Sequence, residues 1–358
     1  MNPHYSNTVW RCGDSKQCCN QEDCDTAECV AQGMGETFSR IAALEYTDAD
    51  REAYQYFGSQ TVGMYTGWPA LDWCTSDYDP RFRPWYASAA SGPKDVVIVI
   101  DISGSMRTGD RMGMAKEATK KVLNTFNQFD YISVVTFDNF ATTYSSTLKP
   151  ATPETIAAIS LWVDQLGPGS STNFVAAFEK AFDVLDASQG GQGGQNARSS
   201  GCTKAILFMS DGTPNKWDNS PGINSDDDFY AMLQTRSAAL GPEAQNVRIF
   251  TYALGSSADP SYTTQIALRN GGLSQLVADD GDLAGAMASY YELFAAGVQT
   301  CSVRWMPYTT TSTKTDVLAA CLPIFELANG ASSCDGAAPA SRAVGGRVIQ
   351  VPLCTFHS

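Results

Sequence analysis

The sequence predicts an α/β fold with a doubly wound, mainly parallel sheet between residues 94 and 298, flanked by segments of a different character. Two observations predict this fold. Short apolar runs alternate with amphipathic segments of helical length, which is the pattern of a sheet whose crossover helices cover both faces. The apolar runs are also hydrophobic throughout, which indicates strands buried on both sides.

Five of these apolar runs are the predicted strands. Each has the length of a strand and is bounded by polar or glycine-containing turns. The five are Val96–Asp101, Tyr131–Phe137, Lys204–Ser210, Val247–Leu254 and Leu273–Val277.

The segments between the strands carry apolar residues three and four positions apart, the spacing of one helix face. The two clearest faces are Met112, Ala115, Val122 and Phe126, and Phe174, Ala177, Phe178, Ala181, Phe182 and Leu185. Further helices are predicted over Pro153–Leu166, Asp226–Ala239, Tyr262–Arg269 and Leu283–Ala295. We interpret the aromatic residues on these faces as core and not as a cofactor site.

The rest of the chain falls into three flanking pieces. Residues 1–35 are rich in cysteine and predicted to be irregular, and residues 36–93 combine a helix with strands rich in glycine and aromatic residues. Residues 299–358 return to strand-like sequence with cysteines. Within the α/β region, the segment 188–201 reads SQGGQGGQNARSSG and is predicted to be a flexible loop.

Composition restricts the function and the compartment. The 358 residues carry a net charge of −14, which argues against nucleic acid as a partner, because phosphate binding needs clustered Lys and Arg. Nine of the 11 cysteines gather near the two ends, while Cys74 and Cys202 lie alone, and the clusters are typical of disulfides formed in an oxidising compartment. We therefore expect an extracellular or cell-surface protein.

The sequence shows neither a signal peptide nor an apolar run long enough to span a bilayer. Together with the cysteines, this leads us to expect a fragment of a larger secreted protein. Any membrane association would then come from regions outside this sequence.

Oxygen-bearing side chains follow two predicted strands and one glycine-rich loop. Asp101 ends the first strand, Ser103 and Ser105 follow it, Asp211 follows the third strand, and Thr172 lies in the loop GPGSSTNF. Because ligands bind beyond the carboxyl ends of strands in an open parallel sheet, we expect these five side chains to face one point. Each alone has a structural alternative as a helix N-cap or a turn residue. Their combination favours a metal-binding set.

The ligand types predict the metal and its use. Hard oxygen ligands select Mg²⁺ or Ca²⁺, with Mn²⁺ as an alternative. Neutral hydroxyl ligands leave much of the charge of the ion uncompensated, so an open coordination position attracts a carboxylate from a partner protein. The ligand set therefore predicts metal-bridged binding and no catalysis.

The motifs of the common enzyme classes are incomplete or absent. Gly104 and Gly109 have the spacing of a phosphate-binding loop, but Asp110 and Arg111 follow where such a loop needs Lys and then Ser or Thr. The only histidines are His4 and His357, and no Gly-X-Ser-X-Gly elbow is present to support a serine hydrolase. We therefore predict that the protein is not an enzyme.

The motifs DISGS, GSSTNF and FMSDGTP resemble the three loops of a von Willebrand factor type A domain. This resemblance spans about 200 residues and implies a metal-ion-dependent adhesion site. It implies that Ser103 and Ser105 bind the metal directly, that Thr172 binds it directly or through water, and that Asp101 and Asp211 bind it mainly through water.

The stretch YDPRFRPWYASAASGPKD, residues 78–95, resembles the entry into the type A domain of the alpha-2-delta auxiliary subunits of voltage-gated calcium channels. In that family the type A domain is inserted in a Cache sensor domain. The resemblance implies that the Cys-rich segment 1–35 is followed by a first Cache piece at 36–93, a type A domain at 94–298 and a second, partial α+β Cache piece at 299–358.

The same resemblance implies a small-molecule pocket in the Cache part. In Cache domains that bind amino acids, an Arg-X-Trp-Tyr motif holds the ligand, and Arg83, Trp85 and Tyr86 match it, with Tyr308 on the return segment. The family also supplies an aspartate two residues after that tyrosine, where this sequence has Thr310. The alternative is that Arg83 and Trp85 pack the two Cache pieces together.

Three functions remain open from the sequence. The favoured one is divalent-cation-dependent binding of a protein that presents an acidic residue, such as a channel pore subunit. The alternatives are a Cache-type extracellular sensor of amino-acid-like molecules and a secreted matrix or adhesion protein.

Overall fold

The protein is described by a computed structural model. The described residues are 7–9, 55–58, 65–68, 83, 86–87, 91–189, 199–215, 221–241, 247–256, 258–288, 290, 304–309, 316–325 and 350–357. The chain divides into two compact units. We call Pro93–Leu293 the α/β unit, and Met1–Gly92 with Phe294–Ser358 the β unit.

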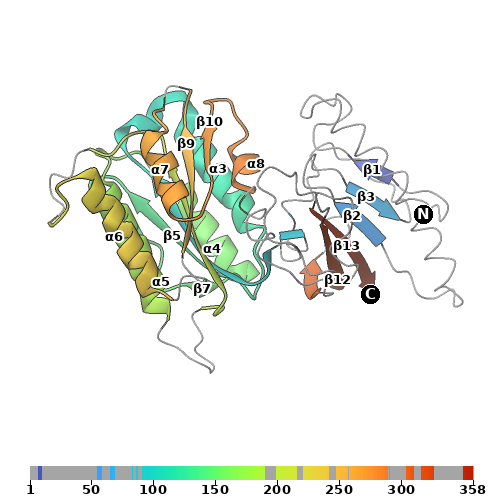
Figure 1. Ribbon diagram of the computed structural model, residues 1–358. Coiled ribbons are helices and arrows are strands. Elements are labelled where there is room, and N and C mark those ends of the chain that lie inside the picture. The colour runs from blue at the N-terminus through green and yellow to red at the C-terminus, as the bar shows by residue number, and fades with distance from the viewer. Residues whose placement is uncertain are drawn as a thin grey trace, which may run out of the picture. The chain divides into compact units, whose positions relative to one another are not determined.

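One seven-stranded sheet forms the centre of the α/β unit (Figure 1). Its strands are β4 (Lys94–Asp101), β5 (Tyr131–Phe137), β6 (Ala141–Thr143), β7 (Lys149–Pro150), β8 (Thr203–Ser210), β9 (Arg248–Leu254) and β10 (Ser274–Val277). The strand order is β10-β9-β8-β4-β5-β6, and β7 also pairs with β5. The pairs from β10 through to β5 are parallel, and β6 and β7 run antiparallel to β5.

Helices cover both faces of this sheet, which confirms the predicted doubly wound architecture. They are α3 (Arg111–Leu123), α4 (Pro153–Asp164), α5 (Phe174–Ser188), α6 (Asp226–Ala239), α7 (Ser261–Arg269) and α8 (Leu283–Ala288). Helices α3, α4 and α8 pack together on one face, and α5, α6 and α7 lie on the other (Figure 1).

Local sequence explains where several helices begin. The Thr152 hydroxyl accepts a hydrogen bond from the Thr155 amide and precedes Pro153, a residue suited to the first helical turn. In the same way, Asn173 caps α5 through the Ala176 amide. Ser225 caps α6, whose first turn holds three aspartates that complement the positive end of the helix dipole.

The core between α5 and the sheet is built around Phe208. Its ring centroid lies 4.7 Å from that of Phe178, 4.9 Å from that of Phe174 and 5.4 Å from that of Phe137. All four side chains are buried, and the geometries include stacked and edge-to-face pairs, both favourable arrangements for aromatic rings. The phenylalanines of α5 are therefore core, as predicted.

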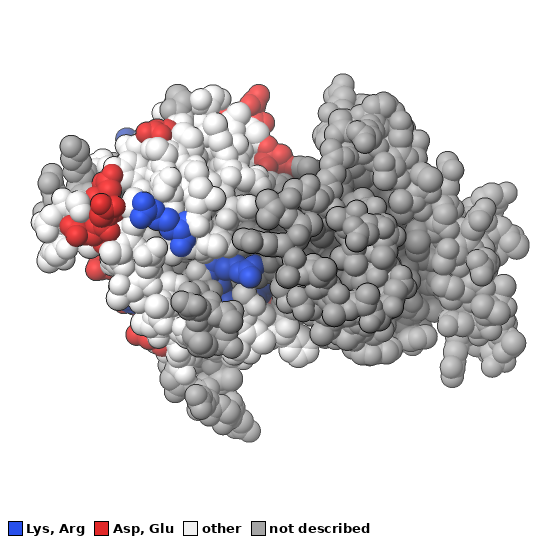
Figure 2. Space-filling model, viewed as in Figure 1, with Lys and Arg blue, Asp and Glu red and all other residues white. Residues whose placement is uncertain are grey.

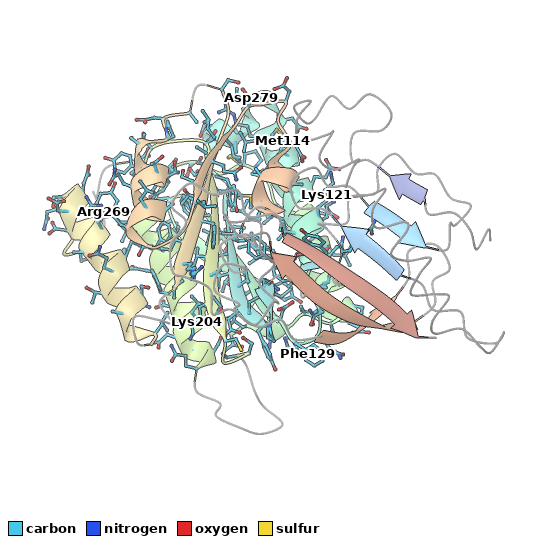
Figure 3. All side chains as sticks on the ribbon, turned by 45° about the vertical axis from the view of Figure 1, so that its right-hand side comes forward. Met114, Lys121, Phe129, Lys204, Arg269 and Asp279 are labelled. Atoms are coloured by element: carbon cyan, nitrogen blue, oxygen red, sulfur yellow. The ribbon has the colours of Figure 1, made fainter. Side chains whose placement is uncertain are left out.

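The topology creates a switch point at the carboxyl end of β4. The chain leaves β4 for β5 on one side, and later returns to β8 on the other side of β4. The connection that follows β4 leads to α3 on one face of the sheet, and the connection that follows β8 leads to α6 on the other face. Open α/β sheets bind ligands at such a switch point. Figure 3 labels Asp279 at this end of the sheet and Phe129 and Lys204 at the opposite end.

The β unit is an antiparallel sheet assembled from both ends of the sequence. Its strands are β1 (Asn7–Val9), β2 (Gln55–Gly58), β3 (Tyr65–Trp68), β11 (Arg304–Thr309), β12 (Asp316–Phe325) and β13 (Gln350–His357), in the order β1-β3-β2-β13-β12-β11. Strand β1 lies in the segment 1–35 that was predicted to be irregular, so this prediction was wrong for Asn7–Val9, where Thr8 and Val9 are β-branched.

The assignment of the β unit to a Cache domain stays a prediction, as do the boundaries of the four predicted pieces. The predicted disulfides also stay a prediction. The register of β12 and β13 places the backbone of Cys321 opposite that of Cys354. The five cysteines between Cys12 and Cys29 lie outside the described residues. In the part of the chain that the structure describes, no helix is long and apolar enough to cross a membrane.

A buried ion pair lies at the opposite end of the sheet, where β4 begins. Lys94 Nζ lies 3.1 Å from Asp130 Oδ1, and both side chains are fully buried. The Asp130 carboxylate also accepts hydrogen bonds from the amides of Lys94 and Asn127. Burial raises the pKa of Asp130, while the Lys94 charge opposes that rise.

Replacing Lys94 with Met should lower the free energy of unfolding by about 3–5 kcal/mol, because the Asp130 carboxylate would stay buried without its cation. The matched control is Lys120→Met, which breaks the exposed Lys120–Asp164 pair and should cost about 0–1 kcal/mol. Urea denaturation of both variants measures the difference, and equal losses would contradict the role given to Lys94.

Candidate metal centre

The turn after β4 places the first three predicted ligands. Asp101 ends the strand, and the Ser103 amide donates a 2.7 Å hydrogen bond back to Asp101 Oδ1. A short 3-10 helix, Gly104–Asp110, follows and leads into α3. The tight turn therefore holds the Asp101 carboxylate next to the two serines, at the carboxyl end of the central strand.

Asp101 is a fully buried carboxyl group with a donor on each oxygen. Oδ1 accepts from the Ser103 amide, and Oδ2 accepts a 2.6 Å hydrogen bond from the Ser210 hydroxyl at the end of β8. Burial raises the pKa of Asp101 to about 6, against the lowering effect of these hydrogen bonds. A cation placed nearby would favour the ionised form.

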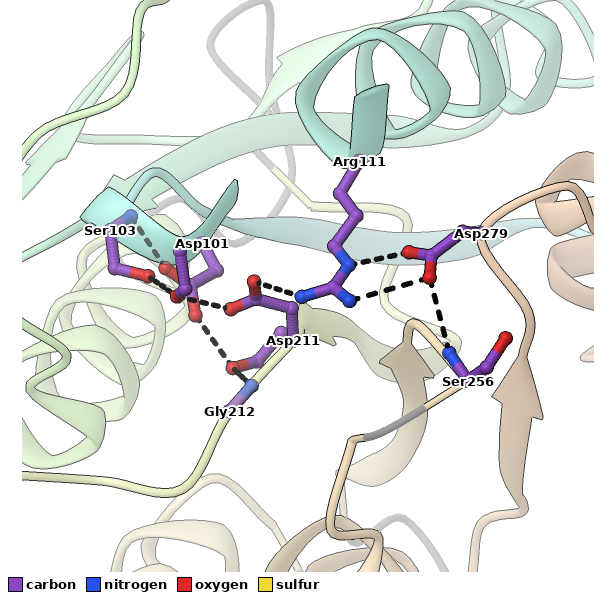
Figure 4. Close-up of polar contacts among 9 residues, drawn as sticks. Asp101, Ser103, Arg111, Asp211, Gly212, Ser256 and Asp279 are labelled. Atoms are coloured by element: carbon purple, nitrogen blue, oxygen red, sulfur yellow. Dashed lines mark hydrogen bonds and ion pairs between the residues drawn. The ribbon is translucent and has the colours of Figure 1, made fainter. Parts of the chain in front are cut away.

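Ser105 links Ser103 to Asp211 by direct contacts. Ser103 and Asp211 are labelled in Figure 4. The two serine hydroxyl oxygens lie 3.1 Å apart, and Ser105 Oγ donates a 2.7 Å hydrogen bond to Asp211 Oδ1. Asp211 follows β8, more than a hundred residues along the chain from Ser105. These contacts join the first and third motifs of the sequence.

The loop that carries Thr172 is joined to the other two loops by backbone hydrogen bonds. The neighbouring Ser170 carbonyl accepts a 3.0 Å hydrogen bond from the Gly104 amide, and the Thr172 carbonyl accepts one of 2.9 Å from the Asn215 amide. The Thr172 loop is therefore tied to the turn after β4 and to the segment after β8. Thr172 itself is buried.

Asp138 at the end of β5 braces the same loop. Its Oδ2 lies 3.4 Å from the Ser170 amide nitrogen, and its carbonyl accepts a 2.8 Å hydrogen bond from the Asn173 amide. Three strands of the sheet thus hold the three loops that carry the predicted ligands.

The donor set fits a hard cation. Ser105 has one hydroxyl proton and donates it to Asp211, so Ser103 must be the donor in the serine pair. Ser105 then keeps one lone pair, and Ser103 keeps both of its lone pairs, to face an ion. Among the described residues, no group of three or more His, Cys, Asp or Glu could hold a metal. A metal here would depend on hydroxyl ligands together with two carboxylates, which suits Mg²⁺, Ca²⁺ or Mn²⁺.

A buried arginine that the sequence motifs do not identify also lies at this site. Arg111, the first residue of α3, donates from Nη1 to Asp211 Oδ2 at 2.9 Å. It also donates from Nε to Asp279 Oδ1 at 2.6 Å, with Nη2 3.5 Å from Asp279 Oδ2 (Figure 4). Its hydrogen bond to Asp279 is the largest influence raising the pKa of Arg111, and Arg111 lowers the pKa of Asp279.

The predicted Cache pocket is only partly within the described residues. Tyr86 is buried, and the Arg83 carbonyl accepts a 3.0 Å hydrogen bond from the Ala87 amide. Trp85 lies outside the described residues. Tyr308 lies in β11, where its backbone is opposite Val317 of β12. The pocket stays a prediction.

The family model described as von Willebrand factor type A domain matches residues 96–213. The chain contains a von Willebrand factor type A domain. The match includes all five predicted ligand positions, from Asp101 to Asp211.

Curated relatives of this type A domain include calcium-channel subunits. The human voltage-dependent calcium channel subunit alpha-2/delta-4 is 27% identical over 62% of this chain and 18% of its own length. The rat alpha-2/delta-3 subunit is 31% identical over 57% of this chain and 18% of its own length. The chain therefore matches less than a fifth of the length of these relatives.

A solved structure of a von Willebrand factor type A protein from Catenulispora acidiphila also resembles the chain. It is 19% identical, covers 74% of this chain and 57% of that chain, and superposes with a TM-score of 0.45.

Replacing Ser210 with Ala should lower the free energy of unfolding of the metal-free protein by about 1–3 kcal/mol, because the buried Asp101 carboxyl would lose its donor at Oδ2. The control is Ser160→Ala on α4, since the Ser160 hydroxyl donates only to the Ile156 carbonyl of its own helix and should change stability by less than about 0.5 kcal/mol. Denaturant unfolding in EDTA compares the two, and an unchanged Ser210→Ala midpoint would show that Asp101 does not need this donor.

Proposed function

We propose that the type A domain binds a divalent cation at Asp101, Ser103, Ser105, Thr172 and Asp211, and that the bound cation holds an acidic residue of a protein partner. The observation that carries this proposal is the contact of Ser105 Oγ with both Ser103 Oγ and Asp211 Oδ1, which joins ligands from two separate loops. The backbone ties of the Thr172 loop support the same centre.

The neutral ligands of the set support binding of an acid. Two carboxylates and neutral hydroxyls surround the ion, and the Arg111 guanidinium already pairs with Asp211. Asp101 and Asp211 would balance a bound dication and Asp279 balances Arg111, so the formal charge of the centre would be zero. The serine and threonine ligands carry no charge, so an open coordination position on the ion would still attract a carboxylate. Ser103 and Ser105 orient the ion, and Asp101 and Asp211 orient the serines through their hydrogen bonds.

The relatives support one class of partner. Because the similar proteins are named as calcium-channel alpha-2/delta subunits, we propose an extracellular or cell-surface role in which the guest carboxylate belongs to a membrane protein such as a channel pore subunit. Charge on the visible surface agrees with a protein partner better than with nucleic acid. On the face in Figure 2 the Lys and Arg side chains form no continuous basic surface over the α/β unit.

The metal step is tested by calorimetry with Mg²⁺ and Ca²⁺. The wild type should bind in the range of about 10⁻⁴ to 10⁻³ M, which is typical of extracellular modules, and Asp101→Ala or the double change Ser103→Ala with Ser105→Ala should abolish binding. Ser160→Ala should leave the binding heat unchanged, because Ser160 lies on α4 and bonds only within its helix. Circular dichroism checks that the variants keep the sheet, and equal heats for wild type and folded variants would rule out this centre.

The guest step is tested with Mn²⁺ as the probe ion and acetate as the probe acid. Bound Mn²⁺ with an exchangeable water should enhance the relaxation of bulk water protons, and saturating acetate should lower that enhancement because it displaces the water. Chloride at the same ionic strength is the control. An enhancement that acetate leaves unchanged would mean that the ion has no position open to a carboxylate.

A further inference from the structure

Arg111 is the one feature of the metal centre that the ligand pattern does not account for. Its side chain is 8% exposed and its guanidinium bridges two carboxylates, Asp211 on the metal side and Asp279 on the outer side. The two aspartates come from the ends of different strands, 100 and 168 residues along the chain from Arg111. An arginine in this place joins the metal centre to the segment after β10.

The position of Arg111 is unfavourable unless its charge has a use. It is the first residue of α3, where the positive end of the helix dipole disfavours a cation, and burial adds a desolvation cost. A neutral or acidic residue would suit the start of the helix better. The ion pairs with Asp211 and Asp279 are what offset these costs.

The surrounding backbone leaves room for this ion-pair bridge. Gly255 has φ of +105°, and a Cβ atom at this position would overlap the Arg111 guanidinium. Gly109 has φ of +58°, and a Cβ atom there would overlap the Asp279 carboxylate. Two glycines with left-handed backbone thus admit the two partners side by side, which marks the bridge as a feature of the fold and not a chance surface contact.

We propose that Arg111 is a resident counter-cation of the metal centre: it holds the Asp211 carboxylate in place, and its charge lowers the affinity for the metal while raising the attraction of the bound metal for an acidic guest. This proposal rests on the metal centre proposed above. Asp211 Oδ2 is held by Arg111, so that Oδ1 stays with Ser105 and the ion. Arg111 acts here as a positioning residue.

Removal of the Arg111 charge should lower the stability of the metal-free protein but raise its affinity for the metal. These opposite changes distinguish the proposed role from a purely structural one. Without metal, the guanidinium neutralises Asp211, so its loss should destabilise the protein. With metal, the Arg111 charge would be separated from the dication only by the Asp211 carboxylate and would repel it, so removing that charge should tighten metal binding on the order of tenfold. Loss of a residue with a purely structural role would lower both the stability and the metal affinity.

The experiment compares Arg111→Gln and Arg111→Lys in the full chain. Arg111→Gln should lower the melting temperature in EDTA and tighten Mg²⁺ binding by about tenfold in calorimetry. Arg111→Lys keeps the charge and should bind Mg²⁺ within about threefold of the wild type, although it loses the two-pronged contact with Asp279. With Mn²⁺ bound, Arg111→Gln should also need more acetate than the wild type to lower the water relaxation.

Two further variants serve as controls for charge. Arg107→Gln removes an exposed arginine that donates to the Pro168 carbonyl, and solvent screening should limit its effect on Mg²⁺ binding to less than about twofold. Asp279→Asn should weaken Mg²⁺ binding, because it leaves the Arg111 charge less compensated. The double variant Arg111→Gln with Asp279→Asn restores the net charge and should return the affinity to within about threefold of the wild type.

Each outcome decides between the two proposals. Tighter binding by Arg111→Gln than by the wild type supports both the counter-cation and the metal centre on which it rests. Weaker binding by Arg111→Gln with normal wild-type binding overturns the counter-cation and leaves the proposed function in place. No binding by either protein overturns both.

Discussion

The proposed metal centre depends on one constraint, the burial of a carboxyl group at the end of the central strand. Strand β4 has neighbours on both sides and helices on both faces, so Asp101 at its end is cut off from water. A buried carboxylate must find donors, and the chain supplies them from its own turn and from the end of β8. Because Asp101 binds donors from both segments, it holds the turn after β4 against the end of β8. Ser103 and Ser105 lie in that turn and are positioned with it.

The sequence predicted much of this architecture because its signals are local. Strand Tyr131–Phe137 was predicted at the bounds observed, and the strands ending at Asp101 and Ser210 began within two residues of the prediction, since continuous apolar runs mark buried strands. Strands β6 and β7 were missed because Ala141–Thr143 and Lys149–Pro150 are short and carry no apolar run. They pair antiparallel with β5, so the sheet is mixed at one edge.

The candidate ligands could be predicted from the sequence because their signals are also local. The role of Arg111 could not be predicted in this way. Asp101, Ser103 and Ser105 stand within five residues, and their position after a strand is readable without a structure. The Arg111 bridge joins residues far apart in sequence, and no local pattern records such a pairing. The available hint was a basic residue at the start of a helix, where the dipole disfavours it, because such a residue needs an acidic partner from elsewhere in the fold.

The β unit has a consequence for the order in which the protein can fold. Strand β2 pairs with β13, whose residues lie about three hundred positions later in the chain. At a synthesis rate of about 5–20 residues per second, a nascent chain would wait roughly 15 to 60 s between making one partner and making the other. The α/β unit is continuous in sequence and is complete on the ribosome before that wait ends. During translation, the early β2 and β3 segment lacks the later strand that pairs with one of its edges, and an unpaired strand edge can pair with another chain.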